Sequence, residues 1–171
     1  MPQPPPSSPP QILTITEFCT AAMSLHSPLI GLDIGAKTIG VALAHMPSGI
    51  VTPHKVITRT KIAKDAAILS QVINDYNVGG IVIGWPLNAD GTLSRRCQAT
   101  RDIWTELSKH LPHRPACFYD ERFSTQKAED FMIKKIDYSR KKRDQIIDKM
   151  AAQLILSEFL IEHMGVPPAY S

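Results

Sequence analysis

The alternation of apolar and polar positions predicts a run of strands at the start of the folded part of the chain. Short apolar runs over 29–35, 39–44 and 50–57 are separated by tight turns, which is typical of an antiparallel three-stranded meander. Pro53, inside the third run, favours an edge strand or a bulge, because proline cannot donate a hydrogen bond to a central ladder. We therefore expect three consecutive antiparallel strands with the third near an edge.

The hydrophobic period then changes, and helices alternate with short buried strands. The expected elements are a helix over 62–76, a strand over 81–84, a helix over 93–111, a strand over 116–119 and helices over 125–135 and 143–164. The first helix places Asp65 on its polar side, and a basic linker separates the last two. The order βββ-α-β-α-β-α predicts an α/β fold, with a five-stranded mixed sheet flanked by helices.

The first 28 residues differ in composition from the rest of the chain. They contain seven of the 14 prolines, and Glu17 is their only charged residue. We interpret 1–28 as a disordered, proline-rich leader, 29–164 as a single folded domain and 165–171 as a C-terminal tail. Met23 is an alternative translation start under this interpretation.

Length, charge and cysteine content narrow the class of protein. The 171 residues, 43% of them hydrophobic, suffice for one domain with a core but not for two full lobes. The three cysteines form no CxxC pair, which indicates neither a disulfide framework nor a zinc site and favours a reducing, cytoplasmic location. No apolar run has the length of a membrane span, and the first residues lack the basic region of a signal peptide.

Three groups of acidic residues are placed where a metal site can form. Asp33 interrupts an apolar strand, where it is either a hydrogen-bonded turn residue beside Gly35 or a metal ligand. The pair Asp120-Glu121 follows another predicted strand, and Asp148 shares a helix face with small residues that allow close packing on a sheet. Converging carboxylates need cations to stay charged, and oxygen ligands select Mg²⁺ or Mn²⁺. We therefore expect a site for metal-assisted phosphodiester cleavage.

Basic residues are concentrated beside the last of these acids. Residues 134–143 contain six basic residues and one acid, a local charge of +5 in a chain whose net charge is +3. Such a run is usually a solvated face, but its position next to Asp148 suits contacts with nucleic-acid phosphates. The candidate nucleic-acid-binding residues are Lys37, Arg95, Arg96, Arg122, Lys141, Lys142 and Arg143.

Four ordered motifs resemble one known family. They are GLDIGAKTIGV over 31–41, IGWPLNADG over 83–91, DERFST over 120–125 and IDKMAA over 147–152. Together they resemble the YqgF (RuvX) family of pre-16S ribosomal RNA nucleases, which are related to RuvC-type Holliday junction resolvases.

The resemblance implies an RNase H-like fold and metal-dependent nuclease chemistry. It places the catalytic and metal-binding acids at Asp33, Glu121 and Asp148. His45 stands where many relatives have an acidic residue, so a fourth acid is not expected. The function it implies is processing of pre-16S rRNA ends, with precursor rRNA and ribosomal particles as partners.

Several alternatives remain open at this stage. The chain is also compatible with a resolvase acting on branched DNA, or with a non-catalytic RNA-binding assembly factor. A P-loop is disfavoured because Ala36 replaces its second glycine. The turn after Asp33 also resembles the phosphate loop of actin-like ATPases and sugar kinases, but those enclose their nucleotide between two lobes. We therefore expect no nucleotide cofactor and no membrane partner.

Overall fold

A computed structural model of the chain describes residues 12–23, 26–122 and 140–167. Within 140–150, side chains are described for Lys142, Ile146, Ile147 and Met150. The helix predicted over 125–135 lies outside the described residues. None of the helices in the described ranges is long and apolar enough to span a membrane.

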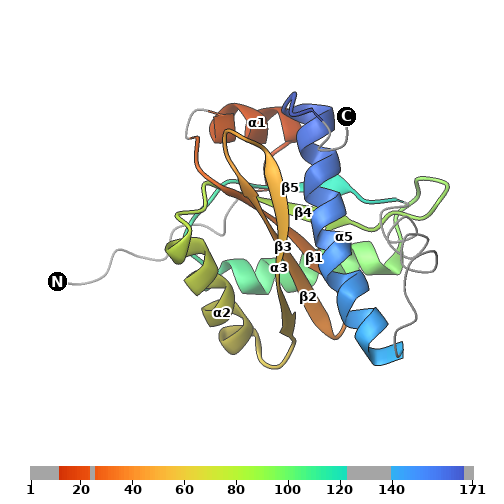
Figure 1. Cartoon of the computed structure of the whole chain (residues 1–171). Coiled ribbons are helices and arrows are strands. Elements are labelled where there is room, and N and C mark those ends of the chain that lie inside the picture. The colour runs from red at the N-terminus through yellow and green to blue at the C-terminus, as the bar shows by residue number, and fades with distance from the viewer. Residues whose placement is uncertain (1–11, 24–25, 123–139, 168–171) are drawn as a thin grey trace.

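The core of the fold is a five-stranded mixed sheet (Figure 1). Its strands are β1 (Leu29–Ile34), β2 (Thr38–His45), β3 (Ile50–Thr58), β4 (Gly80–Trp85) and β5 (Ala116–Asp120). Their order across the sheet is β3-β2-β1-β4-β5; β2 is antiparallel to both β1 and β3, and β4 is parallel to both β1 and β5. The expected mixed sheet and its antiparallel meander are confirmed. As a result, the carboxyl ends of β1, β4 and β5 lie at one edge of the sheet.

The local expectations for the edge and the centre of the sheet are also confirmed. β3 is an edge strand, and the register shifts where Val41 pairs with Lys55 and Ala42 with Pro53. Both readings of Pro53 therefore hold, because the irregularity occurs on an edge strand. β4 lies between two parallel neighbours, and its residues 80–84 are all buried.

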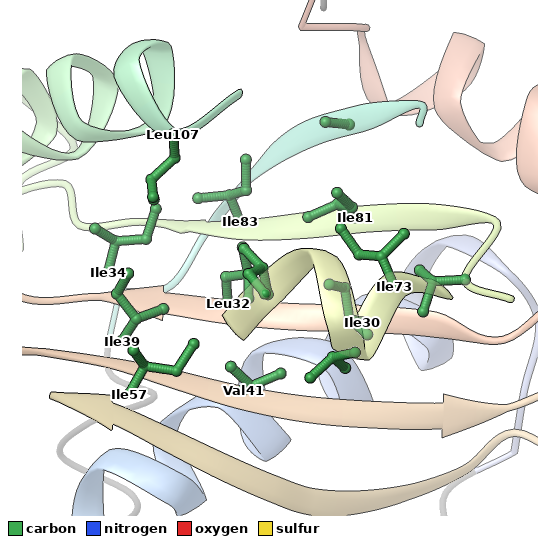
Figure 2. Packing of buried hydrophobic residues seen from close by; sticks show 14 of the residues in the cluster. Ile30, Leu32, Ile34, Ile39, Val41, Ile57, Ile73, Ile81, Ile83 and Leu107 are labelled. Carbon is green, nitrogen blue, oxygen red and sulfur yellow. The ribbon is translucent and has the colours of Figure 1, made fainter. Parts of the chain in front are cut away.

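Helices cover both faces of the sheet (Figure 1). α2 (Ile62–Asp75) and α3 (Arg95–Ser108) pack on one face, where Ile73 and Leu107 meet alternate residues of the central strands (Figure 2). α1 (Ile15–Met23) and α5 (Arg140–His163) pack on the other face. The two-residue period of the strands thus divides the core into two apolar layers.

The prediction of a disordered leader over 1–28 is wrong for residues 12–23. Phe18 of α1 is fully buried, with its ring 5.5 Å from that of Phe159 in an edge-to-face contact. The N–H of Leu13 donates to the carbonyl of Ala116 over 2.8 Å, which ties the segment to β5. The reason is that the prolines before Pro28 lie within the first ten residues, whereas an apolar segment follows them. Residues 1–11 and 24–25 lie outside the described residues.

A capping motif begins α1. The backbone N–H of Glu17 donates to Oγ1 of Thr14 over 3.2 Å, and the backbone N–H of Thr14 donates to the Glu17 carboxylate over 2.9 Å. This reciprocal pair is a capping box, which satisfies two backbone donors at the start of a helix. The T-x-x-E sequence is therefore a helix signal that the proline content of the segment obscured.

Three further expectations about helices need correction. Asp65 is buried rather than on the polar side of α2, because its carboxylate accepts hydrogen bonds from the N–H and hydroxyl of Thr60. α3 begins at Arg95, where Ser94 caps it by accepting from the N–H of Cys97 over 3.1 Å. α5 begins at Arg140, so residues 140–143 of the predicted basic linker belong to the helix.

The burial of Phe18 leads to a stability prediction. Replacing Phe18 by Ala should lower the free energy of unfolding by about 3 kcal/mol, because it leaves a cavity between α1 and α5. Chemical denaturation of the full chain measures this loss. Thr16→Ala on the exposed side of α1 is the control and should change the free energy by less than about 0.5 kcal/mol. Equal stability of the Phe18→Ala variant and the native chain would contradict the docking of α1.

Candidate active site

Two of the three predicted acids come together at the carboxyl ends of the parallel strands. Asp33 is the penultimate residue of β1, and Glu121 directly follows β5. The backbone N–H of Glu121 donates to the carbonyl of Trp85 over 3.2 Å, which joins the ends of β5 and β4. The negative charge of Asp33 contributes to a raised pKa at Glu121, so the two carboxyl groups interact directly through their charges.

The carboxyl group of Glu121 occupies the space that a side chain at Gly84 of β4 would fill. Glu121 is only 6% exposed. A Cβ atom on Gly84 would lie 2.6 Å from Oε2 of Glu121 and 2.7 Å from Cδ1 of Ile155 in α5. These distances are shorter than van der Waals contact, so a side chain at position 84 would displace the carboxyl group or the helix.

Burial makes this acid hard to ionise. It raises the pKa of Glu121 to about 8, mainly by removing the carboxyl group from water and further through the charges of Asp33 and Asp120, while Arg96 acts in the opposite direction. Oε2 of Glu121 is buried and has no hydrogen-bond partner within the described part of the chain. A buried acid oxygen of this kind costs free energy unless a cation or a donor compensates it.

The neighbouring acid has the opposite environment. Asp120 accepts hydrogen bonds from the backbone N–H of Arg122 at 3.0 Å and from its Nε at 2.8 Å, and it forms an ion pair with Nη2 at 2.8 Å. Its charge is therefore compensated by an arginine in the same motif. Of the consecutive pair Asp120-Glu121, Glu121 is thus the acid that faces the interior beside Asp33.

The third predicted acid, Asp148, lies in α5, and its side chain is outside the described residues. The path of α5 nevertheless shows where the backbone of residue 148 lies. A Cβ atom on Gly31 would lie 3.0 Å from the carbonyl oxygen of Ala152, and one on Gly49, at the other end of the sheet, would contact Val166. α5 therefore runs antiparallel to β1, and position 148, one turn before Ala152, lies toward the carboxyl edge. A role for Asp148 stays a prediction.

The acids that are present suit a hard divalent cation. Both described acids, Asp33 and Glu121, offer only oxygen donors, and one of those oxygens is buried without a partner. Within the described ranges, no group of three His, Cys, Asp or Glu side chains is close enough to hold a metal ion. A complete site thus requires a further ligand, for which Asp148 is the candidate. Mg²⁺ and Mn²⁺ match this donor chemistry, whereas the thiol and imidazole ligands favoured by zinc are not involved.

Some of the predicted nucleic-acid-binding residues lie at the same edge. Lys37 is exposed in the turn between β1 and β2, and Arg95 and Arg96 are exposed in the first turn of α3, which follows the β4 end. Arg96 is close enough to lower the pKa of Glu121. Lys142 is exposed in the first turn of α5. The side chains of Lys141 and Arg143 lie outside the described residues.

Arg122 has a structural role that sequence analysis missed. Its guanidinium group is engaged by Asp120, and a Cβ atom on Gly91 would lie 3.1 Å from its Nη1 atom. The loop that contains Gly91 is closed by hydrogen bonds from Thr92 to Asp90 and from Asn88 to Thr92. Arg122 therefore joins the end of β5 to the loop after β4. The asparagine and aspartate turn pattern of this loop was the available sequence signal.

Comparisons with known proteins identify the family of the chain. A family model described as RuvX, Holliday junction resolvase, matches residues 27–162. A protein of Caulobacter sp. (strain K31) named "Putative pre-16S rRNA nuclease" is 41% identical over 158 residues, covering 92% of this chain and 96% of that protein. A protein of Ruegeria pomeroyi with the same name is 42% identical over 143 residues, covering 84% of this chain and 91% of that protein.

The Thermus thermophilus RuvC protein, solved in complex with a Holliday junction substrate, is 12% identical, with a TM-score of 0.49, and the match covers 84% of this chain and 99% of that chain. The names of the family model and of the relatives define a class of nucleases, and the five-stranded mixed sheet flanked by helices is the fold expected from the sequence. The chain belongs to the RuvX family.

The packing of Gly84 against Glu121 gives one prediction. Gly84→Ala should lower nuclease activity at least about 10-fold, because the added methyl group displaces the carboxyl group of Glu121. Gly80→Ala, on the same strand as Gly84, is the matched control. A Cβ there would lie at comparable distances of 2.8 to 3.0 Å from atoms of Phe18 and Leu29, away from the acids. Both variants should lose stability on the order of 1–3 kcal/mol, whereas only Gly84→Ala should lose activity. Equal activities of the two variants would contradict this role of Gly84.

The raised pKa of Glu121 gives a second prediction. The folded state keeps a proton on Glu121 between its ordinary pKa of 4.5 and about 8, whereas the unfolded chain releases it. The free energy of unfolding should therefore fall by about 5 kcal/mol as pH rises through this window, when divalent cations are absent.

Denaturant titrations across this pH range, in the presence of a chelator, measure the effect. Glu121→Gln should remove this loss of stability, and Mg²⁺ added at pH 8 should stabilise the native chain more than the variant. Asp120→Asn is the matched control and should retain the pH dependence, because Arg122 already compensates that carboxylate. A pH slope that Glu121→Gln leaves unchanged would show that Glu121 is not the group responsible.

Proposed function

We propose that this chain is a metal-dependent endonuclease that cleaves phosphodiester bonds of structured nucleic acid, with pre-16S ribosomal RNA as its substrate. The observation that supports this most directly is the buried, uncompensated carboxyl oxygen of Glu121 beside Asp33. The names of relatives about 40% identical over most of the chain supply the substrate. A cytoplasmic location and contact with ribosomal particles belong to the same proposal.

In this mechanism Asp33, Glu121 and Asp148 hold Mg²⁺ or Mn²⁺. When bound, such ions activate a water molecule for attack on phosphorus and stabilise the leaving oxygen. The contribution of the chain is to hold Glu121 rigidly, since the close packing of Gly84 and Ile155 leaves its carboxyl group little freedom. The ion pair between Asp120 and Arg122 keeps the adjacent acid out of the site.

Basic residues at the carboxyl edge orient the substrate. Lys37 lies in the turn after β1, Arg95 and Arg96 lie in the first turn of α3, and residues 141–143 lie in the first turn of the helix that carries Asp148. Lysine and arginine contacts to phosphate position a nucleic acid without reading its sequence. The enzyme therefore selects its substrate by the shape of the backbone. Arg122 contributes to substrate binding indirectly, by holding the loop that contains Gly91 next to the end of β5.

Branched DNA is the second candidate substrate, because the matching family model is described as a Holliday junction resolvase. The same carboxylate site serves either substrate, since the bond cleaved is a phosphodiester in both.

A cleavage assay in Mg²⁺ or Mn²⁺ tests the proposal. The substrates are precursor rRNA, single strands and four-way DNA junctions. Asp33→Asn, Glu121→Gln and Asp148→Asn should each lower the rate at least about 100-fold, because each removes a charged metal ligand. Precursor rRNA should be cut faster than a junction.

Two matched controls make the assay specific. Asp120→Asn changes the neighbour of Glu121, and Asp144→Asn changes the acid one turn before Asp148 on α5. Both should retain most of the activity. If the native chain cuts no substrate in either cation, or if Asp33→Asn cuts as fast as the native chain, the proposed site is wrong. Preferential junction cleavage would select the branched-DNA function.

A further inference from the structure

Arg59 holds the turn that follows Asp33 through three consecutive carbonyl groups. Its Nη1 donates to the carbonyl oxygen of Gly35 over 3.1 Å and to that of Ala36 over 3.0 Å. Its backbone N–H donates to the carbonyl of Lys37 over 2.9 Å. One residue after the end of β3 thus fixes the whole β1–β2 turn, which we call the Arg59 turn (residues 35–37).

Arg59 is itself held by the segment that follows it. The next residue, Thr60, donates from both its N–H and its hydroxyl to the carboxylate of Asp65, at distances of 3.1 to 3.2 Å. Asp65 is only 1% exposed and lies in the first turn of α2. A chain of hydrogen bonds therefore extends from a buried acid of α2, through Thr60 and Arg59, to the turn beside Asp33.

The geometry of the peptide unit determines what this turn presents to solvent. In a trans peptide the C=O of one residue and the N–H of the next point in opposite directions. Because the carbonyls of Gly35 and Ala36 point to Arg59, the N–H groups of Ala36 and Lys37 point away from it. Neither N–H has a hydrogen-bond acceptor within the described ranges, and both residues are exposed. Two consecutive backbone donors that point away from Arg59, beside a lysine, can bind an anion.

We propose that Arg59 is a positioning residue that presents the N–H groups of Ala36 and Lys37, together with the Lys37 ammonium group, to a backbone phosphate of the nucleic acid. The proposal rests on the nuclease function proposed above and adds a specific phosphate contact to it. Arg59 touches no substrate in this arrangement. It acts by fixing the direction of two peptide groups next to Asp33.

The buried Nε atom of Arg59 argues against a role of this side chain in stabilising the fold alone. Its Nε is buried and has no hydrogen-bond partner among the described residues. A buried donor without a partner costs free energy, which offsets part of what the two Nη1 bonds contribute. Removal of this side chain should therefore affect the turn more than the stability of the fold.

Arg114 is a matched control, because it is a second arginine that holds backbone carbonyls. Its Nε donates to the carbonyl of Val78 over 2.6 Å, and its Nη1 donates to that of His113 over 2.8 Å. Val78 and Arg114 precede β4 and β5, so this arginine lies at the opposite edge of the sheet. Loss of its bonds should lower stability without changing phosphate binding.

The test follows backbone amide signals by NMR while inorganic phosphate, or a short single-stranded RNA, is added to the full chain with divalent cations chelated. In the native chain and in Arg114→Ala, the amides of Ala36 and Lys37 should shift on addition of either probe. In Arg59→Ala these shifts should be lost, and the RNA should bind roughly 5- to 10-fold more weakly. Arg59→Lys should also bind weakly, because its ammonium nitrogen ends one bond short of Nη1.

These outcomes test the role of Arg59 independently of the nuclease function. Amides of Ala36 and Lys37 that do not shift in the native chain, or that still shift in Arg59→Ala, would overturn it. Binding by Arg59→Lys equal to that of the native chain would show that charge alone matters, and would also overturn it. Because cations are absent from this test, a native chain that shows the shifts yet cleaves nothing in the cleavage assay would refute the nuclease function alone.

Discussion

The close approach of α5 to the sheet is the constraint on which the site depends. Gly31 and Gly84 have no side chain on the face that α5 covers, and an added Cβ at either position would fall 2.6 to 3.0 Å from atoms of α5 or Glu121. The helix can therefore lie directly on β1 and β4. This proximity leaves Glu121 buried and places the backbone of position 148 toward the strand ends. With larger residues in these strands the helix would stand further out, and water would reach the acids.

The electrostatics of the site follow from that packing. Asp120 and Glu121 are adjacent and chemically alike, yet one is paired with Arg122 at the surface and the other is buried beside a second acid. A compensated surface carboxylate contributes little to binding, because its charge is already neutralised. Glu121 keeps its proton at neutral pH while no cation is present, and once it ionises its charge lies in a place of low dielectric, where attraction to a divalent cation is strong. The pairing of Asp120 therefore leaves Glu121 as the acid available to a metal.

The sequence predicted those parts of the structure that leave a local pattern. Four of the five strands were predicted because each is a short apolar run, and β3 because a strand pattern follows the turn signal at 46–49. Asp33 was identified because a charge inside an apolar run is unusual. α1 was missed because the proline content of residues 1–28 was judged as a whole, which hid the Thr14 and Glu17 capping pair. Asp65 was misplaced because helical spacing does not show that a first-turn acid turns back to Thr60. The role of Arg59 could not be predicted at all, because backbone carbonyls accept hydrogen bonds whatever their side chains are.

The direction of the strands explains why these scattered residues meet. β2 is antiparallel to both of its neighbours, so β3 runs in the same direction as β1, β4 and β5, and the carboxyl ends of these four strands lie at one edge. Asp33, Arg59, the loop after Trp85 and Glu121 all lie at or just beyond those ends. Residues in a turn after a strand end can be substituted without altering the sheet. Acidic side chains and hydrogen-bond donors can therefore lie there without disturbing the two apolar layers. The opposite edge, where Arg114 holds the carbonyl of Val78, begins β4 and β5 and serves to align them. The polarity of the sheet thus separates the residues that bind and react from those that hold the strands in register.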